Sequence, residues 1–308
     1  MLKLKTKHVL TGEELSADEL SGLLDAAQAL ADERKQGRTR TDLAGKCLTL
    51  LFDKPSLRTR VSFTAAMQEA GGNVIECLSS TRKSEEPEDV AKVLGGYCHA
   101  VMIRTHEHKI VERMAAASPI PIINGLSDSH HPCQVMADLL TLRQSFGSLQ
   151  GLEFAYVGDG NNMLHSLLLL LPFMGVKVRY ACPAGYEPSA FIVKQARKRA
   201  KEGGGSIEAC ADPVQAVKGA SAVYTDVWTS MGFEKEEKDR ERAFADFQLN
   251  ESLFAHAASN AIIMHCMPME RGKEISETLA NHPSTVFYRQ SENRLHAQKA
   301  LLLGLLGK

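Results

Sequence analysis

Residues 47–72, CLTLLFDKPSLRTRVSFTAAMQEAGG, predict a strand, a tight turn and a helix in direct succession. The apolar run at 47–51 is typical of a buried strand in a parallel sheet. From Val61 to Ala70 the apolar residues recur at approximately helical spacing. Pro55-Ser56 is a helix start signal, and Gly71-Gly72 is a stop signal. A buried strand that runs directly into a helix indicates the α/β class.

The turn between this strand and helix is rich in hydrogen-bond donors. Ser56, Arg58 and Thr59 lie at the predicted helix N-terminus, where backbone N–H groups have no partner within the helix. Together they predict an anion site, and phosphate is its natural ligand. Arg60 is expected to point away and to be structural. The alternative is a basic surface turn before an ordinary helix.

The same alternation of strand and helix continues along the chain. A helix is predicted at 11–31, capped by Ser16 or Thr11. Further strands are predicted at 73–78, 100–103, 120–123, 152–157, 176–181, 222–225, 261–264 and 286–288. We therefore predict an α/β protein with two domains, each a parallel sheet flanked by helices, joined by interdomain helices. The predicted domains are 1–147 and 148–290, and a C-terminal helix, 291–308, returns to the first domain.

Composition excludes several classes of function. The chain has 308 residues and a formal net charge of -1, which argues against nucleic-acid or anionic-membrane partners. It has no apolar run of membrane-spanning length and no secretory signal. The seven cysteines are scattered without a CxxC pair, which indicates a reduced, cytoplasmic protein without a structural zinc site. The charged run at 234–242 is expected to be a solvated helix or loop.

Ligands of parallel sheets bind beyond the carboxyl ends of the strands. In the first half these positions hold phosphate-type donors, including Arg104. In the second half they hold amide, carboxylate and thiol groups, including Asn162, Asp226 and Cys266. This division predicts two substrates, one per domain, that react in the cleft between them.

The segment His131-Pro132-Cys133-Gln134 predicts a second polar cluster. Pro132 suits the first position of a helix, which makes His131 approximately the cap and places Gln134 on the same face. The helix dipole disfavours a charged imidazole, so a neutral His131 could donate to a carbonyl oxygen, as Gln134 could. With Arg104 these residues would form an electrophilic clamp. His130 is expected to face solvent, and the alternative role for His131 is capping alone.

Two other motifs invite interpretations that the sequence does not support. Gly158-Asp159-Gly160-Asn161-Asn162 resembles a dinucleotide fingerprint, but Met163 replaces the third glycine, and no carboxylate follows the next strand. His265-Cys266 suggests a metal or a thiol nucleophile, but no third ligand lies at metal spacing. No metal and no organic cofactor is therefore expected.

With these residues assembled, the chain resembles the ornithine carbamoyltransferases of the aspartate/ornithine carbamoyltransferase family over nearly its whole length. The motifs occur in the family's order: Ser-x-Arg-Thr-Arg at 56–60, His-Pro-x-Gln at 131–134, Gly-Asp-Gly-Asn-Asn at 158–162, Asp-x-x-x-Ser-Met-Gly at 226–232, His-Cys-x-Pro at 265–268 and Glu-Asn-Arg at 292–294. The resemblance implies transfer of the carbamoyl group from carbamoyl phosphate to the δ-amine of L-ornithine, giving citrulline for arginine biosynthesis. It also implies assembly at least as a homotrimer.

The resemblance assigns roles by position. Carbamoyl phosphate would be bound by Ser56, Leu57, Arg58, Thr59, Arg104, His131, Gln134, Cys266, Met267 and Arg294. Ornithine would be bound by Asn162, Asp226, Ser230, Met231 and Cys266. The residues expected to act in catalysis are Arg58, Arg104, His131, Gln134 and Cys266.

Three departures from the family pattern bear on these assignments. Leu57 replaces the commoner Thr, so only its backbone can contact phosphate. Residues 79–89 form a shorter segment than usual and lack the Gln often supplied to a neighbouring subunit, for which Ser80, Arg82 or Lys83 could substitute. Met269-Glu270 replaces a small residue and a basic one near the amino-acid pocket. The alternatives are a carbamoyltransferase for an amine such as N-acetylornithine or putrescine, and a non-catalytic metabolite-binding homologue.

Overall fold

The computed structural model describes residues 2–78, 84–229 and 236–307. The chain divides into two compact units, the first formed by Met1–Leu140 with Glu292–Lys308 and the second by Thr141–Ser291. Both divisions fall inside a helix, α6 (Pro132–Phe146) and α12 (Phe287–Leu306). The predicted class, two α/β domains with parallel sheets, is confirmed.

The first unit is built on a four-stranded parallel sheet with the strand order β2-β1-β3-β4. Its strands are β1 (Cys47–Phe52), β2 (Asn73–Leu78), β3 (Ala100–Arg104) and β4 (Ile122–Leu126). Its helices are α1 (Ala17–Lys35), α2 (Leu57–Glu69), α4 (Pro87–Gly95), α5 (His108–Ala117), the first part of α6 and most of α12.

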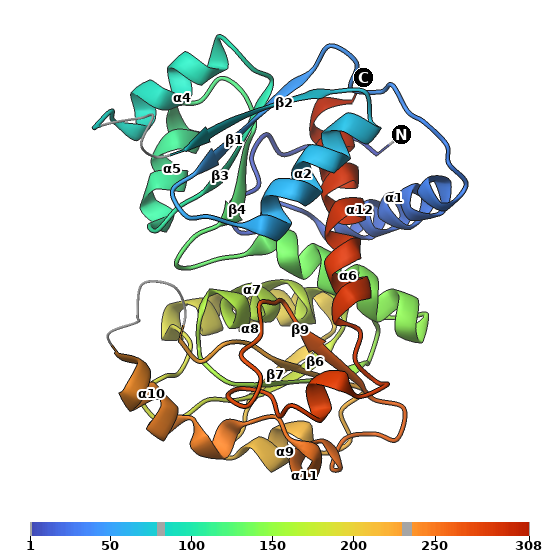
Figure 1. The fold of residues 1–308 in the computed structure, drawn as a ribbon, viewed down its shortest axis with the longest axis vertical. Helices are drawn as coiled ribbons and strands as arrows, with labels where there is room; N and C mark the ends of the chain where they lie inside the picture. The colour runs from blue at the N-terminus through green and yellow to red at the C-terminus, as the bar shows by residue number, and fades with distance from the viewer. Residues whose placement is uncertain (1, 79–83, 230–235, 308) are drawn as a thin grey trace. The chain divides into compact units, whose positions relative to one another are not determined.

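Helices cover both faces of this sheet (Figure 1). Residues of α4 and α5, among them Val90 and Met114, pack with Leu51 and Ile103 in one apolar cluster. Figure 1 shows α2 and α12 on the other side, and the two ends of the chain lie close together in this unit. The Leu4 N–H donates to the Gly304 carbonyl over 3.1 Å, which ties the N-terminal segment to the last helix.

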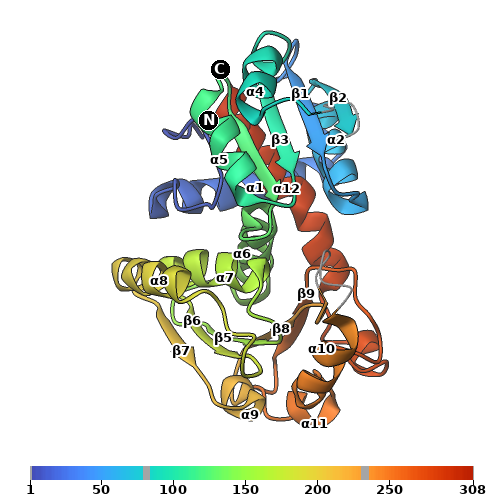
Figure 2. The same ribbon diagram turned by 90° about the vertical axis from the view of Figure 1, so that its left-hand side faces the viewer.

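The second unit is built on a five-stranded parallel sheet with the strand order β7-β6-β5-β8-β9. Its strands are β5 (Glu153–Val157), β6 (Lys177–Ala181), β7 (Ser206–Ala209), β8 (Ala222–Thr225) and β9 (Ile262–His265). Its helices are α7 (Asn162–Leu170), α8 (Ala190–Gly203), α9 (Pro213–Val217), α10 (Glu237–Ala243) and α11 (Glu251–Phe254), besides the ends of α6 and α12. Figure 2 shows α7 and α8 on one face of the sheet and α9 and α11 on the other.

Some predicted elements were wrong or incomplete. The strand predicted at 286–288 is instead the start of α12, and Thr285 makes only an isolated bridge to Ile263. The edge strand β7 was missed, because three of its four residues are exposed and it lacks an apolar pattern. The first helix begins at Ala17, later than predicted, because Ser16 caps it with a capping box to Glu19.

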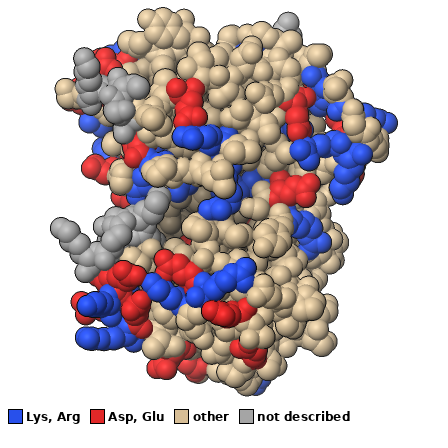
Figure 3. All heavy atoms as spheres, in the orientation of Figure 1, with Lys and Arg blue, Asp and Glu red and all other residues tan. Residues whose placement is uncertain are grey.

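Charged side chains of both signs are interspersed over the face of the molecule shown in Figure 3. This distribution agrees with the near-zero net charge of the chain. Among the described residues, no helix is both long and apolar enough to cross a membrane.

Candidate active site

The predicted anion site lies at the junction of β1 and α2. Ser56 is the N-cap of α2, with extended backbone angles, and its hydroxyl accepts a hydrogen bond from the Thr59 N–H over 3.3 Å. α2 begins at Leu57, so the N–H groups of its first turn have no acceptor inside the helix. The Leu57 side chain is 74% exposed, which leaves its backbone as the group that faces the turn. Arg60 forms an ion pair with Glu76 over 2.5 Å, as a structural role requires.

Arg294, on α12, joins three of the predicted carbamoyl-phosphate residues. Its Nη1 donates to the Gln134 Oε1 over 2.7 Å and lies 3.2 Å from the His131 Nε2. Its Nη2 donates to the Thr59 hydroxyl over 3.0 Å. Arg294 is 2% exposed and Thr59 is fully buried, so these contacts lie out of bulk water. The helices that carry them, α2 and α12, lie side by side in Figures 1 and 2.

The charge state of His131 follows from this contact. A guanidinium N–H can only donate, so the His131 Nε2 accepts, and the ring proton of the neutral imidazole is on Nδ1. Burial lowers the pKa of His131 well below its usual value, and Arg294, Arg104 and Arg58 lower it further. His131 therefore remains neutral at physiological pH, as the clamp requires.

Gln134 is held in one orientation by two partners. Its Nε2 donates to the Asp138 Oδ1 over 2.9 Å, while its Oε1 accepts from Arg294. Asp138 is fully buried and lies one turn further along α6, so it orients the amide from the core side. Asp138 was not identified from the sequence, although its spacing of four residues from Gln134 was a usable signal.

The second unit gathers its polar groups around Asp226, which follows β8 and is 5% exposed. The Asp226 Oδ1 accepts from the Val227 N–H over 2.9 Å and from the Cys266 Sγ over 3.0 Å. Its Oδ2 accepts from the Asn161 Nδ2 over 2.9 Å. A carboxylate oriented in this way is suited to bind an ammonium group.

Asn161 is a site residue that was not assigned from the sequence, where Asn162 was named instead. The Asn161 Oδ1 caps α7 by accepting from Met163 N and Leu164 N, which turns its amide nitrogen toward Asp226. Asn162 is the first residue of α7. The cap preference of Asn before an apolar helix was the signal that could have identified this role.

A third potential metal ligand does exist near His265 and Cys266, contrary to the prediction. The ligand atoms of Asp226, His265 and Cys266 all lie within 4.8 Å of one another, because adjacent parallel strands bring their ends together. However, the His265 Nδ1 accepts from the Met267 N–H over 2.8 Å, and its Nε2 lies 3.1 Å from the Glu274 Oε1. Both ring nitrogens therefore have protein partners, and a metal would have to displace one of them.

Two expectations about solvent exposure were wrong. His130 is 7% exposed, because its backbone is bound on both sides by Ser127 and its ring packs edge-on against His108 at 4.7 Å. Arg240, in the charged run 234–242, is 6% exposed and donates to Asp159 over 2.9 Å and to the Trp228 carbonyl over 2.8 Å. The other described charged residues of α10 are exposed, as predicted.

Several predicted residues lie outside the described part of the chain. They are Ser230 and Met231, assigned to ornithine, and Ser80, Arg82 and Lys83, considered as substitutes for the missing Gln. The changed pair Met269-Glu270 is described. Met269 packs against the apolar core of the second unit, and the Glu270 Oε2 lies 3.0 Å from the Lys273 Nζ.

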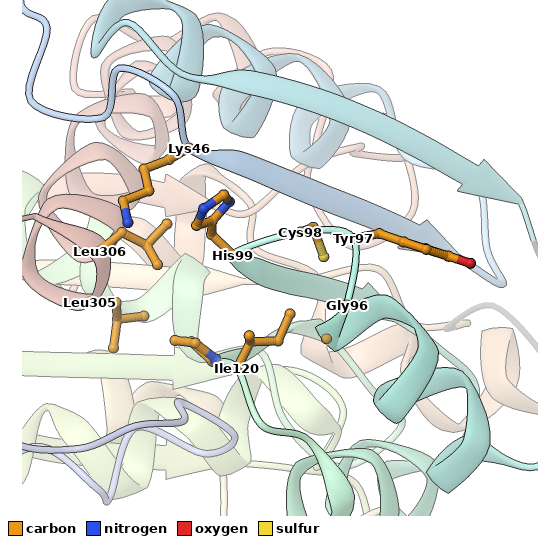
Figure 4. A pocket seen from close by; sticks show the side chains of 10 residues that line it. Lys46, Gly96, Tyr97, Cys98, His99, Ile120, Leu305 and Leu306 are labelled. Atoms are coloured by element: carbon orange, nitrogen blue, oxygen red, sulfur yellow. The ribbon is translucent and has the colours of Figure 1, made fainter.

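A cavity of about 480 Å³ in the first unit is separate from these residues (Figure 4). It is lined by Lys46, Gly95, Gly96, Tyr97, Cys98, His99, Ile120, Pro121, Leu305 and Leu306. Lys46 and His99 immediately precede β1 and β3, so the cavity lies at the amino ends of these strands. It contains none of the predicted site residues.

Comparison with known proteins agrees with this geometry. The carbamoyl-P binding domain of aspartate/ornithine carbamoyltransferases matches residues 7–144, and the Asp/Orn binding domain of the same family matches residues 150–305. The two matched domains, one for carbamoyl phosphate and one for aspartate or ornithine, are those of a two-substrate carbamoyltransferase. The chain belongs to the aspartate/ornithine carbamoyltransferase family, as the sequence motifs indicated.

Within this family, the chain is similar to proteins named ornithine carbamoyltransferases. The chain is 44% identical over 308 residues to an ornithine carbamoyltransferase of Anoxybacillus flavithermus, covering 99% of this chain and 98% of the relative. It is 42% identical over 310 residues to an anabolic ornithine carbamoyltransferase of Pyrococcus furiosus, covering 100% and 98%. A solved structure of the Pyrococcus furiosus enzyme superposes with a TM-score of 0.96 at 41% identity, covering 99% of each chain.

Proposed function

We propose that this enzyme transfers the carbamoyl group of carbamoyl phosphate to the δ-amine of L-ornithine, yielding L-citrulline and phosphate for arginine biosynthesis. The observation that carries the proposal is the Arg294 cluster, in which one buried guanidinium joins the N-terminal turn of α2 to a neutral His131. Full-length similarity to ornithine carbamoyltransferases supports the choice of acceptor.

In this proposal the first unit binds carbamoyl phosphate. The phosphate is held by Ser56, Arg58, Thr59 and the backbone N–H of Leu57, because a helix N-terminus and guanidinium groups stabilise the charge of the leaving group. Arg104, His131 and Gln134 polarise the carbonyl oxygen, and a neutral imidazole can donate without repelling the neighbouring arginines. Arg294 links Thr59 of the phosphate turn to His131 and Gln134 of the carbonyl clamp.

The second unit binds ornithine in this proposal. Asp226 pairs with the α-ammonium group of ornithine, and Asn161 holds the Asp226 carboxylate in place. We assign Asn162, Ser230 and Met231 to the same substrate, and Cys266 to the region of its side chain. The neutral δ-amine attacks the carbamoyl carbon to form the new C–N bond, and the carbonyl oxygen gains negative charge. As the carbonyl re-forms, the C–O bond to phosphate breaks, and the proton lost from the attacking nitrogen leaves with the phosphate. An ordinary alkyl amine has a pKa of roughly 10.4, so the rate should rise from neutral to alkaline pH.

Citrulline formation from ornithine and carbamoyl phosphate tests the proposal directly. The wild-type enzyme should form citrulline, and Arg58→Ala should reduce kcat/KM by at least about a hundredfold, because a charged hydrogen-bond donor to the phosphate is lost. N-acetylornithine, putrescine and aspartate should be poor acceptors in the same assay. No citrulline from wild type, or faster carbamoylation of another amine, would reject ornithine as the substrate.

We further propose a cytoplasmic homotrimer. The seven cysteines are all free, which suits a reducing compartment. In the first unit, α2 and β2 expose apolar side chains at Val61, Ile75 and Leu78. Exposed apolar groups on two neighbouring elements are typical of a protein interface, and we assign this surface to contacts between subunits. We also retain 1–147, 148–290 and 291–308 as the proposed domain boundaries.

A further inference from the structure

The loop that carries Cys266 has an unfavourable backbone conformation. Met267 has a φ of 57°, and among the described residues it is the sole non-glycine residue with a positive φ. A side chain on Cβ disfavours this left-handed region, so surrounding contacts have to hold the backbone there. Cys266 immediately precedes this residue, and the position of its thiol depends on what holds Met267.

The contact that holds Met267 comes from His265. The Met267 N–H donates to the His265 Nδ1 over 2.8 Å. A backbone N–H cannot accept, so Nδ1 carries no proton, and the proton of the neutral ring is on Nε2. The side chain of His265 is fully buried, which keeps this short bond out of water.

Glu274 fixes the tautomer that this bond requires. The Glu274 Oε1 lies 3.1 Å from the His265 Nε2 and accepts a hydrogen bond from its N–H. The same oxygen also accepts a hydrogen bond from the Glu270 N–H over 2.6 Å. One carboxylate oxygen therefore binds both sides of the loop 265–270. Glu274 is fully buried, and it reaches the loop from four residues beyond Glu270.

The backbone of His265 is held independently of its ring. Its backbone N–H donates to the Gln290 Oε1 over 3.0 Å, and the Gln290 Nε2 donates to the Tyr224 hydroxyl over 3.2 Å. These bonds hold the main chain at the end of β9, whereas Glu274 determines the orientation of the ring. The Met267 contact therefore depends on Glu274.

We propose that Glu274 is a positioning residue for Cys266. Acting through His265, it holds the backbone of Met267 and thereby keeps the Cys266 Sγ 3.0 Å from the Asp226 Oδ1. Glu274 does not touch the substrate. Its effect on ornithine binding rests on the proposed function, whereas its effect on the thiol does not.

The test compares three substitutions at position 274 with one nearby control. Glu274→Gln keeps an oxygen that can accept both bonds and should leave the KM for ornithine within about threefold of wild type. Glu274→Ala removes the acceptor, and Glu274→Asp withdraws it from the loop. Both should raise the KM for ornithine about tenfold or more. Glu277→Ala, at an exposed glutamate of the same segment, should behave as wild type.

The second readout is the rate at which iodoacetamide alkylates Cys266, followed by peptide mass spectrometry without substrates. A thiol that loses its hydrogen bond to the Asp226 Oδ1 is no longer held in place and meets the reagent more readily, so Glu274→Ala and Glu274→Asp should be alkylated at least about threefold faster than wild type. Measurements are made well below the unfolding temperature of each variant. If Glu274→Ala does not fold, the KM for ornithine and the alkylation rate of Glu274→Asp test the proposal instead.

Unchanged alkylation and an unchanged KM for ornithine in the folded Ala or Asp variants would overturn the positioning role. A lower unfolding temperature with neither change would show that Glu274 only stabilises the fold, and this would also overturn it. If wild type formed no citrulline but Cys266 alkylation still followed Glu274 as expected, the proposed function would fail while the positioning role stood.

Discussion

Leu57 lies in the turn that we propose binds phosphate, and the role of its backbone N–H there can be tested by substitution. It is the first residue of α2, its side chain is 74% exposed, and the preceding Ser56 is extended, with φ -160° and ψ 113°. Proline is well tolerated at the first position of a helix and requires an extended residue before it. Leu57→Pro therefore removes the N–H donor while it preserves the helix.

We expect Leu57→Pro to raise the KM for carbamoyl phosphate by about tenfold to a hundredfold, the loss of one hydrogen bond to a charged group. Leu57→Ala is the matched control, because it removes the same side chain but keeps the N–H, and its KM should stay within about twofold. Steady-state kinetics with ornithine at saturation measure both values. Equal KM values for the two variants would show that this backbone N–H does not bind the phosphate.

His131 gives a second prediction at the scale of a residue. Its pKa is lowered in the folded protein by burial and by three arginines, so the native state resists protonation while the unfolded chain accepts a proton below about pH 6.5. The contribution of His131 to stability is therefore present at neutral pH and decreases as the pH falls below that value. The imidazole proton signals of His131 should not shift between pH 8 and 6 in NMR spectra, whereas the urea-unfolded chain should titrate in that range.

The short helix α10 has buried contacts that its charged sequence does not predict. Its charged composition predicted solvation, which holds for its other described charged residues, yet Arg240 is buried against Asp159 and lies 4.8 Å from the ring centroid of Tyr186. Phe244, on the following turn, is fully buried between Tyr186 and Trp228. Arg240 thus fastens the helix to Asp159 of the Gly-Asp-Gly-Asn-Asn turn, and Phe244 packs the end of the helix against Tyr186 and Trp228. None of these contacts is local in sequence.

The Asp159–Arg240 pair predicts a specific dependence of stability on pH. Burial raises the pKa of Asp159 to about 6 despite the attraction of Arg240. Because its folded pKa lies above the unfolded one, the native state takes up this proton first, and the contribution of Asp159 to stability is lost as the pH rises through 6. Relative to Asp159→Asn, wild type should gain about 2 to 3 kcal/mol in free energy of unfolding between pH 7 and 4.

Urea unfolding of both proteins across this range measures the difference. The same comparison with Asp246→Asn, an exposed carboxylate nearby, should show a much smaller change. A constant difference between wild type and Asp159→Asn would mean that Asp159 ionises in the folded protein as it does in the unfolded chain.

Elements built from local signals were the predictable part of the fold. The β1 strand, the cap of α2 and the proline start of α6 all follow from adjacent residues. Two kinds of feature were not predictable in this way. At Val286-Phe287-Tyr288, residues that favour strands lie at the beginning of a helix, because the continuation of α12 outweighs local propensity. The second kind is Glu274, whose partner His265 lies at the end of β9. Asn161 and Asp138, in contrast, carried local signals that could have identified them.

For the whole molecule, the proposed trimer gives a prediction about the exposed surface of α2 and β2. Ile75 is 49% exposed on the edge strand β2, and Val61 is 54% exposed on α2. A lysine in an apolar interface loses hydration without gaining a partner, so Ile75→Lys should dissociate the assembly. Sedimentation velocity should show three copies of the 33.7 kDa chain for wild type and mainly single copies for the variant.

Val214→Lys provides the control, because Val214 is 41% exposed on α9 in the second unit, away from the proposed surface. It should sediment as wild type does. An Ile75→Lys protein that remains a trimer would place the subunit contacts on another part of the molecule.

The division of the first unit between two distant parts of the chain determines when its binding site can exist. Thr59 and Arg294 are hydrogen-bonded across a separation of 235 residues, and all of Thr141–Ser291 is made between them. During synthesis a growing chain therefore has Thr59, His131 and Gln134 long before the guanidinium that joins them. Closing so long a loop slows folding, and until it closes the partners of α12 in the first unit stay uncovered. The proposed phosphate site is thus among the last features of the nascent protein to be completed, and premature termination before residue 294 yields a chain that lacks Arg294.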